Sequence, residues 1–414
     1  MPLTSSSEDF VTRRLWRPLS VGILAASFLI TIPVSANAED NGASSSELAG
    51  SVNDGLLDLV AGSSQWEGSS DLTLQGLLSS ANLLDSSSTS GSGSTLPDSL
   101  LSSESGYPLP TVDNIDEVKI VKKEVENRAD RREKWSIASP SMKRVVDVQI
   151  VRPADPNAPA PMLYLLDGIG GNKNSSGWVN TGAVKNVFAN ENATVVMPLG
   201  AAASLYTDWD KDDPALGTIK WETFITKELA PLLESDPSLH FNDKRGIGGL
   251  SMGASGAVRM ANNNPDFFNA AIGISGCYST MDAIGKQTVN LIVGSRGGNV
   301  ENMWGPVGSE KWNAQDVNQN PQGIKDMAVY LSAASGAAGD VDIKDYEGEP
   351  FYNMVAGLYL ERGAHECTKN LEESLSEAGA PDITVSYLDT GMHNWRNYEA
   401  QLQPAWDDVK HALD

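Results

Sequence analysis

The chain of 414 residues carries 30 Lys and Arg against 54 Asp and Glu, a formal net charge of −24 at pH 7. So acidic a protein is a poor partner for nucleic acid, which requires basic surface, and its charge does not favour anionic lipid. It has two cysteines and no Cys or His cluster at metal-ligand spacing, so we expect no metal and no cofactor.

Residues 1–38 are typical of an export signal. Three arginines precede a largely apolar stretch over 19–34, and small residues at 36–38 form a cleavage site. A membrane anchor is the alternative, but the apolar stretch is short for a spanning helix. We therefore expect an exported protein, either secreted or held in the cell envelope.

Residues 39–114 are rich in Ser and Gly and poor in aromatic residues. Such a composition buries too little apolar surface to offset the entropy of ordering, which predicts a disordered linker. Its short Leu clusters leave open transient helices or surface-binding spots. The folded catalytic body is expected over 115–414.

Within 115–414, short apolar runs alternate with stretches of helical periodicity. The runs predicted as strands are 145–151, 162–166, 193–199, 246–250, 270–275, 327–333 and 383–388. The segments predicted as helices are 221–233, 254–262, 351–378 and 398–413. This alternation predicts an α/β fold with a mostly parallel central sheet covered by helices on both faces. Residues 278–326 show no long periodic element and are expected to form a cap near the site.

A Gly-Leu-Ser-Met-Gly run at 249–253 stands where a predicted strand passes directly into a predicted helix. This arrangement is typical of the nucleophile elbow of α/β-hydrolases, in which a sharp turn exposes the serine hydroxyl. Ser251 is then the nucleophile, and the backbone amide of Met252 can donate to an oxyanion. The flanking glycines let the backbone pass where a Cβ would clash.

In this class the chain order is serine, acid, histidine. His240 precedes the serine, His411 lies among charges in the last helix, and His365 falls within a helical stretch. His393 lies in a loop just past the last predicted strand, at the edge of the sheet where a general base must lie. We therefore predict His393 as the base.

The residues alone leave the acid open. It is expected after about residue 333, and Asp389 is too close to His393 for the usual topology. The remaining carboxylates are Asp340, Asp342, Asp345, Glu347, Glu349, Glu361 and Glu366.

Cys277 and Cys367 form an even pair in a chain expected to be exported, which predicts a disulfide. Two separate buried thiols are the alternative. A bridge between these positions would tie the segment after one strand to the segment that contains Glu361.

Seven short motifs, kept in order over about 135–410, resemble those of the antigen 85 type mycolyltransferases and their corynomycolyl relatives. The motifs lie at 139–142, 164–168, 206–209, 220–224, 249–253, 303–306 and 391–395. A single Gly-x-Ser-x-Gly match is weak evidence, but seven ordered motifs are specific. The resemblance implies an α/β-hydrolase fold for the whole body.

The resemblance also implies site residues. The nucleophile falls on Ser251, the base on His393, and the acid on Glu361, which follows a Leu as in the family. The oxyanion donors fall on the backbone amides of Ile169 and Met252.

A sugar-binding pair falls on Asp167 and Trp395. The family often has Arg where this chain has Gly170, which predicts a wider or differently selective acceptor site. The small disulfide loop of the family is missing, the segment before Glu361 is dissimilar, and the long N-terminal linker has no counterpart in the compact mycobacterial members.

The implied function is transfer of a mycolyl chain from a trehalose monoester to a sugar hydroxyl, through an ester on the serine. The implied partners are the trehalose mycolate glycolipid and a cell-wall glycan acceptor such as arabinogalactan, with no nucleic acid and no obligate protein partner. A secreted carboxylesterase of the same fold is one alternative. A non-catalytic protein that binds cell wall or matrix is the other.

Overall fold

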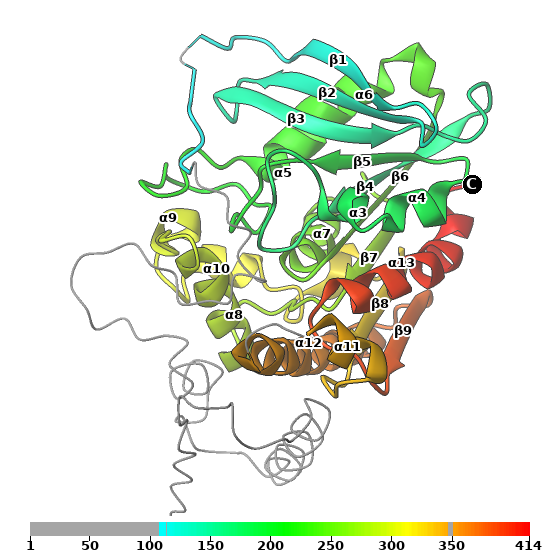
Figure 1. Cartoon of the computed structure of the whole chain (residues 1–414). Coiled ribbons are helices and arrows are strands. Elements are labelled where there is room, and N and C mark those ends of the chain that lie inside the picture. The colour runs from blue at the N-terminus through cyan, green and yellow to red at the C-terminus, as the bar shows by residue number, and fades with distance from the viewer. Residues whose placement is uncertain (1–106, 113, 347–350) are drawn as a thin grey trace, which may run out of the picture. The chain divides into compact units, whose positions relative to one another are not determined.

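The computed structural model describes residues 107–112, 114–346 and 351–414 (Figure 1). The expected export signal at 1–38 lies outside the described residues, as does nearly all of the expected linker at 39–114. None of the helices in the described part of the chain combines the length and the apolar character needed to cross a bilayer.

A nine-stranded sheet forms the centre of the described body, in the order β1-β2-β3-β5-β4-β6-β7-β8-β9 (Figure 1). The strands are β1 Lys119–Asn127, β2 Arg132–Ser139, β3 Arg144–Val151, β4 Ala160–Leu166, β5 Thr194–Pro198, β6 Phe241–Leu250, β7 Ala270–Ile274, β8 Ala328–Ala334 and β9 Ile383–Leu388. The pairs from β1 through β3 to β5 are antiparallel, and every pair from β5 to β9 is parallel. The predicted α/β-hydrolase architecture, with a mostly parallel sheet, is confirmed.

The sequence analysis missed the first two strands. β1 is exposed along most of its length, and β2 begins with charged residues, so neither shows the continuous apolar run of a buried strand. β1 forms an edge of the sheet, and its pairing with β2 shifts register at two points.

Helices cover both faces of the sheet (Figure 1). They are α3 Gly177–Asn180, α4 Ala183–Phe188, α5 Trp221–Thr223, η1 Phe224–Leu229, α6 Ala230–Glu234, η2 Pro237–Leu239, α7 Met252–Asn263, α8 Ala283–Gly294, α9 Glu301–Trp304, α10 Glu310–Ala314, η3 Pro321–Gly323, α11 Asp340–Asp345, α12 Phe351–Glu377, α13 Trp395–Val409 and η4 Lys410–Ala412. The expected helix at 221–233 is three consecutive helical segments. Just past the end of α12, Gly379 adopts a φ of 72°, which favours glycine.

The expectation that 278–326 lacks a long element was wrong, because α8 spans 12 residues. Only four of them are buried, so its apolar residues do not stand out as one periodic stripe. α8 packs against α12 (Figure 1). These two helices therefore stand together near the carboxyl edge of the sheet.

Alternation along the central strands divides the core into two apolar clusters. In β4, Met162 and Tyr164 belong to one cluster, whereas Leu163 and Leu165 belong to the other. The first cluster includes the buried side of α7, and the second includes α4 and α13. Both faces of β4 are thus completely buried, and the polar residues that follow such strands are held on a rigid frame.

Candidate active site

Ser251 stands in the sharp turn between β6 and α7, with φ 52° and ψ −121°. A Cβ added to Gly249 would lie 2.5 Å from the carbonyl carbon of Gly253, and one added to Gly253 would lie 2.5 Å from the backbone oxygen of Asp167. Glycine is therefore required on both sides of the serine. The Ser251 amide donates to the Ile274 carbonyl over 2.9 Å, which fixes this strained turn to β7.

A continuous chain of hydrogen bonds starts at the serine. Ser251 Oγ lies 2.8 Å from His393 Nε2, and His393 Nδ1 lies 2.8 Å from Glu361 Oε2. Glu361 is completely buried, and the His393 side chain is 9% exposed. The structure thus brings together three residues that are 142 and 32 positions apart in the sequence.

The second oxygen of Glu361 accepts three further hydrogen bonds. Oε1 accepts from Ser275 Oγ at 2.7 Å, from the Ala334 amide at 2.7 Å and from Asn397 Nδ2 at 3.0 Å. These contacts fix the plane of the carboxylate so that Oε2 faces His393. Sequence reasoning missed Ser275 and Asn397, because one Ser or Asn among many carries no motif.

A mostly apolar pocket, open to solvent, lies beside Ser251 and His393. One wall is formed by α8 and the other by α12. The lining residues of these helices are Thr288, Leu291, Ile292, Leu360, Gly363 and Ala364. Ile169 and Met252 line the same cavity, so the two residues predicted to form the oxyanion hole flank the serine.

Asp167 and Trp395 lie together at the start of α3 instead of in that cavity. Asp167 Oδ1 accepts from Ser176 Oγ and from the Gly177 amide, each at 3.0 Å. A Cβ added to Gly177 would lie 2.0 Å from the Trp395 ring, which itself packs edge-on against Trp178 at 5.4 Å. Burial raises the pKa of Asp167 to about 7. The loop after Asp167 reaches the serine, because a Cβ added to Gly168 would lie 3.6 Å from Ser251 Cβ.

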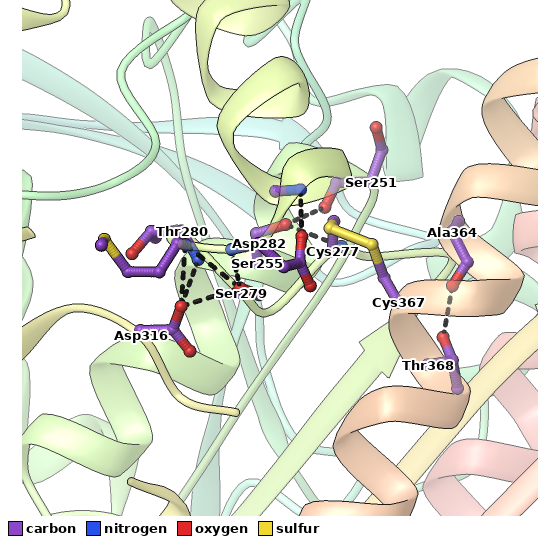
Figure 2. The surroundings of a disulfide bond; sticks show 12 residues. Ser251, Ser255, Cys277, Ser279, Thr280, Asp282, Asp316, Ala364, Cys367 and Thr368 are labelled. Carbon is purple, nitrogen blue, oxygen red and sulfur yellow. Dashed lines mark hydrogen bonds between the residues drawn. A yellow bond between two sulfur atoms is a disulfide. The ribbon is translucent and has the colours of Figure 1, made fainter. Parts of the chain in front are cut away.

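The predicted disulfide is present: Cys277 is bonded to Cys367, with 4.8 Å between their Cα atoms (Figure 2). The alternative of two separate thiols was wrong. The bond connects the segment after β7 to α12, and Cys277 also lines the cavity beside Ser251.

Several of the other candidate histidines and acids have partners of their own, whereas Glu347 and Glu349 lie outside the described residues. His365 and Lys369 pair with Glu366, and His411 with Asp382. Asp342 binds the Gly339 amide and Asn394 Nδ2. Among the residues that the structure describes, no group of three or more His, Cys, Asp or Glu is arranged to hold a metal ion.

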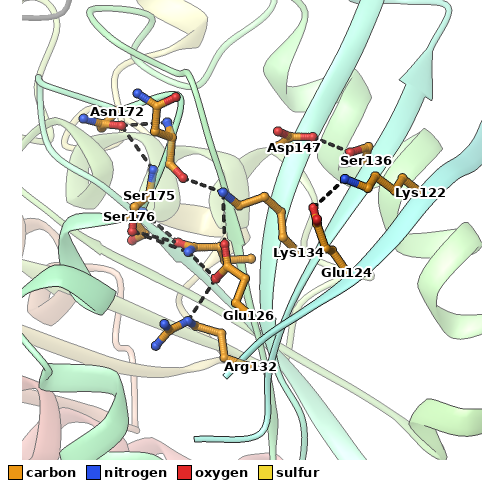
Figure 3. A network of polar contacts seen from close by, with 12 residues as sticks. Lys122, Glu124, Glu126, Arg132, Lys134, Ser136, Asp147, Asn172, Ser175 and Ser176 are labelled. Carbon is orange, nitrogen blue, oxygen red and sulfur yellow. Dashed lines mark hydrogen bonds and ion pairs between the residues drawn. The ribbon is translucent and has the colours of Figure 1, made fainter. Parts of the chain in front are cut away.

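A second polar network lies where β1 and β2 face the loop before α3 (Figure 3). Glu126 pairs with Arg132 and Lys134, and it also accepts from Gln149 Nε2. Lys134 additionally donates to the Asn174 carbonyl. These partners satisfy one another and hold the antiparallel edge of the sheet to the loop before α3.

The fold and the hydrogen-bonded chain from Ser251 through His393 to Glu361 define an enzyme of the serine hydrolase type. A family model described as putative esterase matches residues 139–409. The chain is 30% identical over 286 residues to diacylglycerol acyltransferase/mycolyltransferase Ag85A of Mycobacterium tuberculosis, covering 67% of this chain and 80% of that protein. It is 28% identical over 289 residues to diacylglycerol acyltransferase/mycolyltransferase Ag85B of Mycobacterium leprae, covering 67% of this chain and 83% of that protein.

The chain therefore belongs to the antigen 85 type mycolyltransferase family, within the esterase family, and it is an enzyme of the acyltransferase class. Two solved structures are similar in fold. MPT51 (FbpC1) of Mycobacterium tuberculosis has a TM-score of 0.55 at 23% identity, covering 67% of this chain and 96% of its own. An S-formylglutathione hydrolase of Agrobacterium tumefaciens has a TM-score of 0.50 at 16% identity, covering 72% of this chain and 100% of its own.

Proposed function

We propose that this protein transfers a mycolyl chain from a trehalose monoester to a sugar hydroxyl of a second trehalose monoester or of cell-wall arabinogalactan. The carrying observation is the hydrogen-bonded chain from Ser251 through His393 to Glu361, which opens on an apolar cavity. The substrate class is taken from the relatives whose names state mycolyl transfer.

In the first half-reaction, His393 Nε2 accepts the proton of Ser251 as Oγ attacks the ester carbonyl carbon. Glu361 holds the imidazole by its Nδ1–H and stabilises the imidazolium that forms. The backbone amides of Ile169 and Met252 donate to the oxyanion, where one such donor is typically worth about 10² to 10³ in rate. Trehalose leaves with the proton from His393, and the acyl group remains on Ser251 as an ester.

In the second half-reaction, the acceptor hydroxyl gives its proton to His393 and attacks the acyl ester. The tetrahedral intermediate collapses, and Ser251 regains its proton. Attack by water would give the free acid instead, so the outcome depends on how well the site holds a sugar. Asp167 and Trp395, next to the loop that reaches Ser251, are the residues proposed to hold it.

The cavity between α8 and α12 is proposed to receive the acyl chain. Its lining is apolar, and burying a CH₂ group there stabilises the bound substrate by about 0.8 kcal/mol. A site of this kind favours a lipid ester over a small polar one. Export, through the segment at 1–38, would place the enzyme on the side of the membrane where its proposed wall acceptor lies.

Product analysis tests this proposal. The purified protein is incubated with a trehalose monoester, and the expected products are trehalose and the diester. A carboxylesterase, the second candidate, would release mainly free acid, and added trehalose would not accelerate turnover of an acyl donor. A protein that binds wall or matrix without catalysis would give neither product, and replacing Ser251 would leave its binding unchanged.

A further inference from the structure

We propose that Asn397 is a positioning residue for the acid Glu361, an inference that rests on the proposed Ser251–His393–Glu361 chemistry. Asn397 lies in the first turn of α13 and is buried. Its Nδ2 donates to Glu361 Oε1 at 3.0 Å and also lies 3.4 Å from Ser275 Oγ. It touches no reacting atom, so its effect on the reaction passes through Glu361.

Glu361 sets the orientation of the Asn397 side-chain amide. Its Oδ1 is buried and has no hydrogen-bond partner among the described residues, which is a cost that a residue kept only for packing would avoid. Turning the amide round would set Oδ1 against the carboxylate, where two acceptors repel. The carboxylate therefore selects the orientation that leaves Oδ1 without a donor.

The surrounding backbone is arranged to admit this side chain. Gly391, with a φ of 139°, would carry a Cβ 2.7 Å from Ala334 Cβ and 3.3 Å from Asn397 Oδ1, so glycine at this position leaves room for both neighbours. The backbone N–H of Asn397 donates to the side-chain oxygen Oδ1 of Asn394, the N-cap residue of α13. The residue that begins α13, the loop of His393 and the acid of α12 are thereby held in one arrangement.

Ser275 and Asn397 donate to the same oxygen of Glu361, Oε1. Ser275 also has a positive φ, 53°, and it is buried. A non-glycine residue keeps such a conformation only where its surroundings impose it. Here the Ser275 amide donates to Ser332 O and the hydroxyl donates to Glu361 Oε1, each at 2.7 Å.

The test is a double-mutant cycle on the full-length protein, with a p-nitrophenyl ester and a fluorophosphonate label that need no mycolyl substrate. Asn397→Leu keeps the size and removes the donor. We expect kcat and the labelling rate of Ser251 to fall about 10- to 100-fold, with KM within about twofold, as for a lost hydrogen bond to a charged group. In a Glu361→Gln background the same change should alter kcat less than about twofold.

Gln401 supplies the matched control. It is a buried amide one turn further along α13, and its Oε1 accepts from Tyr330 O–H instead of facing the site. Gln401→Leu should leave kcat within about twofold even where it lowers the thermal unfolding midpoint. If Asn397→Leu does not fold, Asn397→Asp, which keeps the shape and replaces the donor by an acceptor, should lose at least as much kcat at pH 8.

The outcomes separate the two hypotheses. Equal losses from Asn397→Leu in the wild-type and the Glu361→Gln backgrounds would show independent action and would overturn the positioning role alone. Unchanged kcat in Asn397→Leu would overturn it as well. If Glu361→Gln itself keeps full activity, the proposed triad fails, and the positioning role fails with it.

Discussion

Cys277 lies two residues after Ser275, and its disulfide partner Cys367 lies six residues after Glu361 on α12. One covalent bond thus joins the two segments that also meet through the hydrogen bond between Ser275 and Glu361. The acid is held by its own contacts and by a crosslink nearby on the same helix.

Replacing both cysteines by serine should therefore lower stability and activity together. Loop closure over 90 residues predicts a loss of about 4 to 5 kcal/mol in the free energy of unfolding. Urea unfolding measures this loss, and the labelling rate of Ser251 by a fluorophosphonate reports the site. Thiol titration of the native, unreduced protein should find no reactive thiol, and two would contradict the bond.

Ser251→Ala should abolish acyl transfer and fluorophosphonate labelling without unfolding the protein. The reason is that the turn is fixed by Gly249, Gly253 and the hydrogen bond from the Ser251 backbone N–H to the Ile274 carbonyl, none of which uses the hydroxyl. Mass spectrometry after labelling checks this, with circular dichroism for the fold. Ser238→Ala, on the surface, is the control, and a label that persists in the Ser251 variant would sink the nucleophile assignment.

Glu361→Gln should lower kcat by several orders of magnitude, because the amide cannot hold His393 in the useful tautomer and stabilise its cation, as in serine proteases. Steady-state kinetics measure the loss. Asp342→Asn and Glu366→Gln are the comparisons, since both acids lie near the site and hold other partners. An active Glu361 variant beside an inactive Glu366 variant would move the acid to Glu366.

Gly363→Leu should shorten the acyl chain that the enzyme accepts. A Cβ on Gly363 would meet only Ile284 Cγ2, at 3.9 Å, so a side chain fits the fold while it fills the cavity. Displacing three methylenes at about 0.8 kcal/mol each lowers kcat/KM for a long-chain ester about 50-fold. The kcat/KM for an acetyl ester should stay unchanged, because its short chain does not reach the filled space. Gly294→Leu, in open space at the end of α8, is the control; equal losses on both esters in Gly363→Leu would argue against an acyl cavity.

Asp167→Asn should flatten the pH dependence of stability. Burial raises the pKa of Asp167 from 3.8 to about 7, so the folded state binds this proton more tightly than the unfolded state does. Stability is then fully present below about pH 4 and falls as pH rises to about 7, by up to roughly 1.4 kcal/mol per pH unit. Unfolding by urea from about pH 5 to about pH 8 checks this. Parallel curves for the two proteins would contradict it.

The buried parallel strands could be predicted from the sequence because both of their faces are apolar, which leaves a continuous signal in β4 and β5. The elbow could be predicted because two glycines are required at fixed positions beside Ser251. His393 followed from chain order and its place after β9. Each of these features depends on local sequence.

What could not be predicted depends on contacts between distant segments. Ser275 and Asn397 are ordinary residue types until the fold sets them beside Glu361. From residue type alone Glu361 was one of several acids, and only the family resemblance singled it out. The edge strand β1 lacks an apolar run since most of it faces solvent.

That edge has a consequence for solubility. Among the described residues, β1 forms one border of the sheet and pairs with β2 alone, and Val121 and Val125 are exposed on it. An open border of this kind can recruit a strand from another molecule and start aggregation. Three lysines within β1 and two irregularities in its pairing with β2 make such stacking costly. The strand that contributes least to the core thus carries features that, in β proteins generally, discourage pairing between the edges of two molecules.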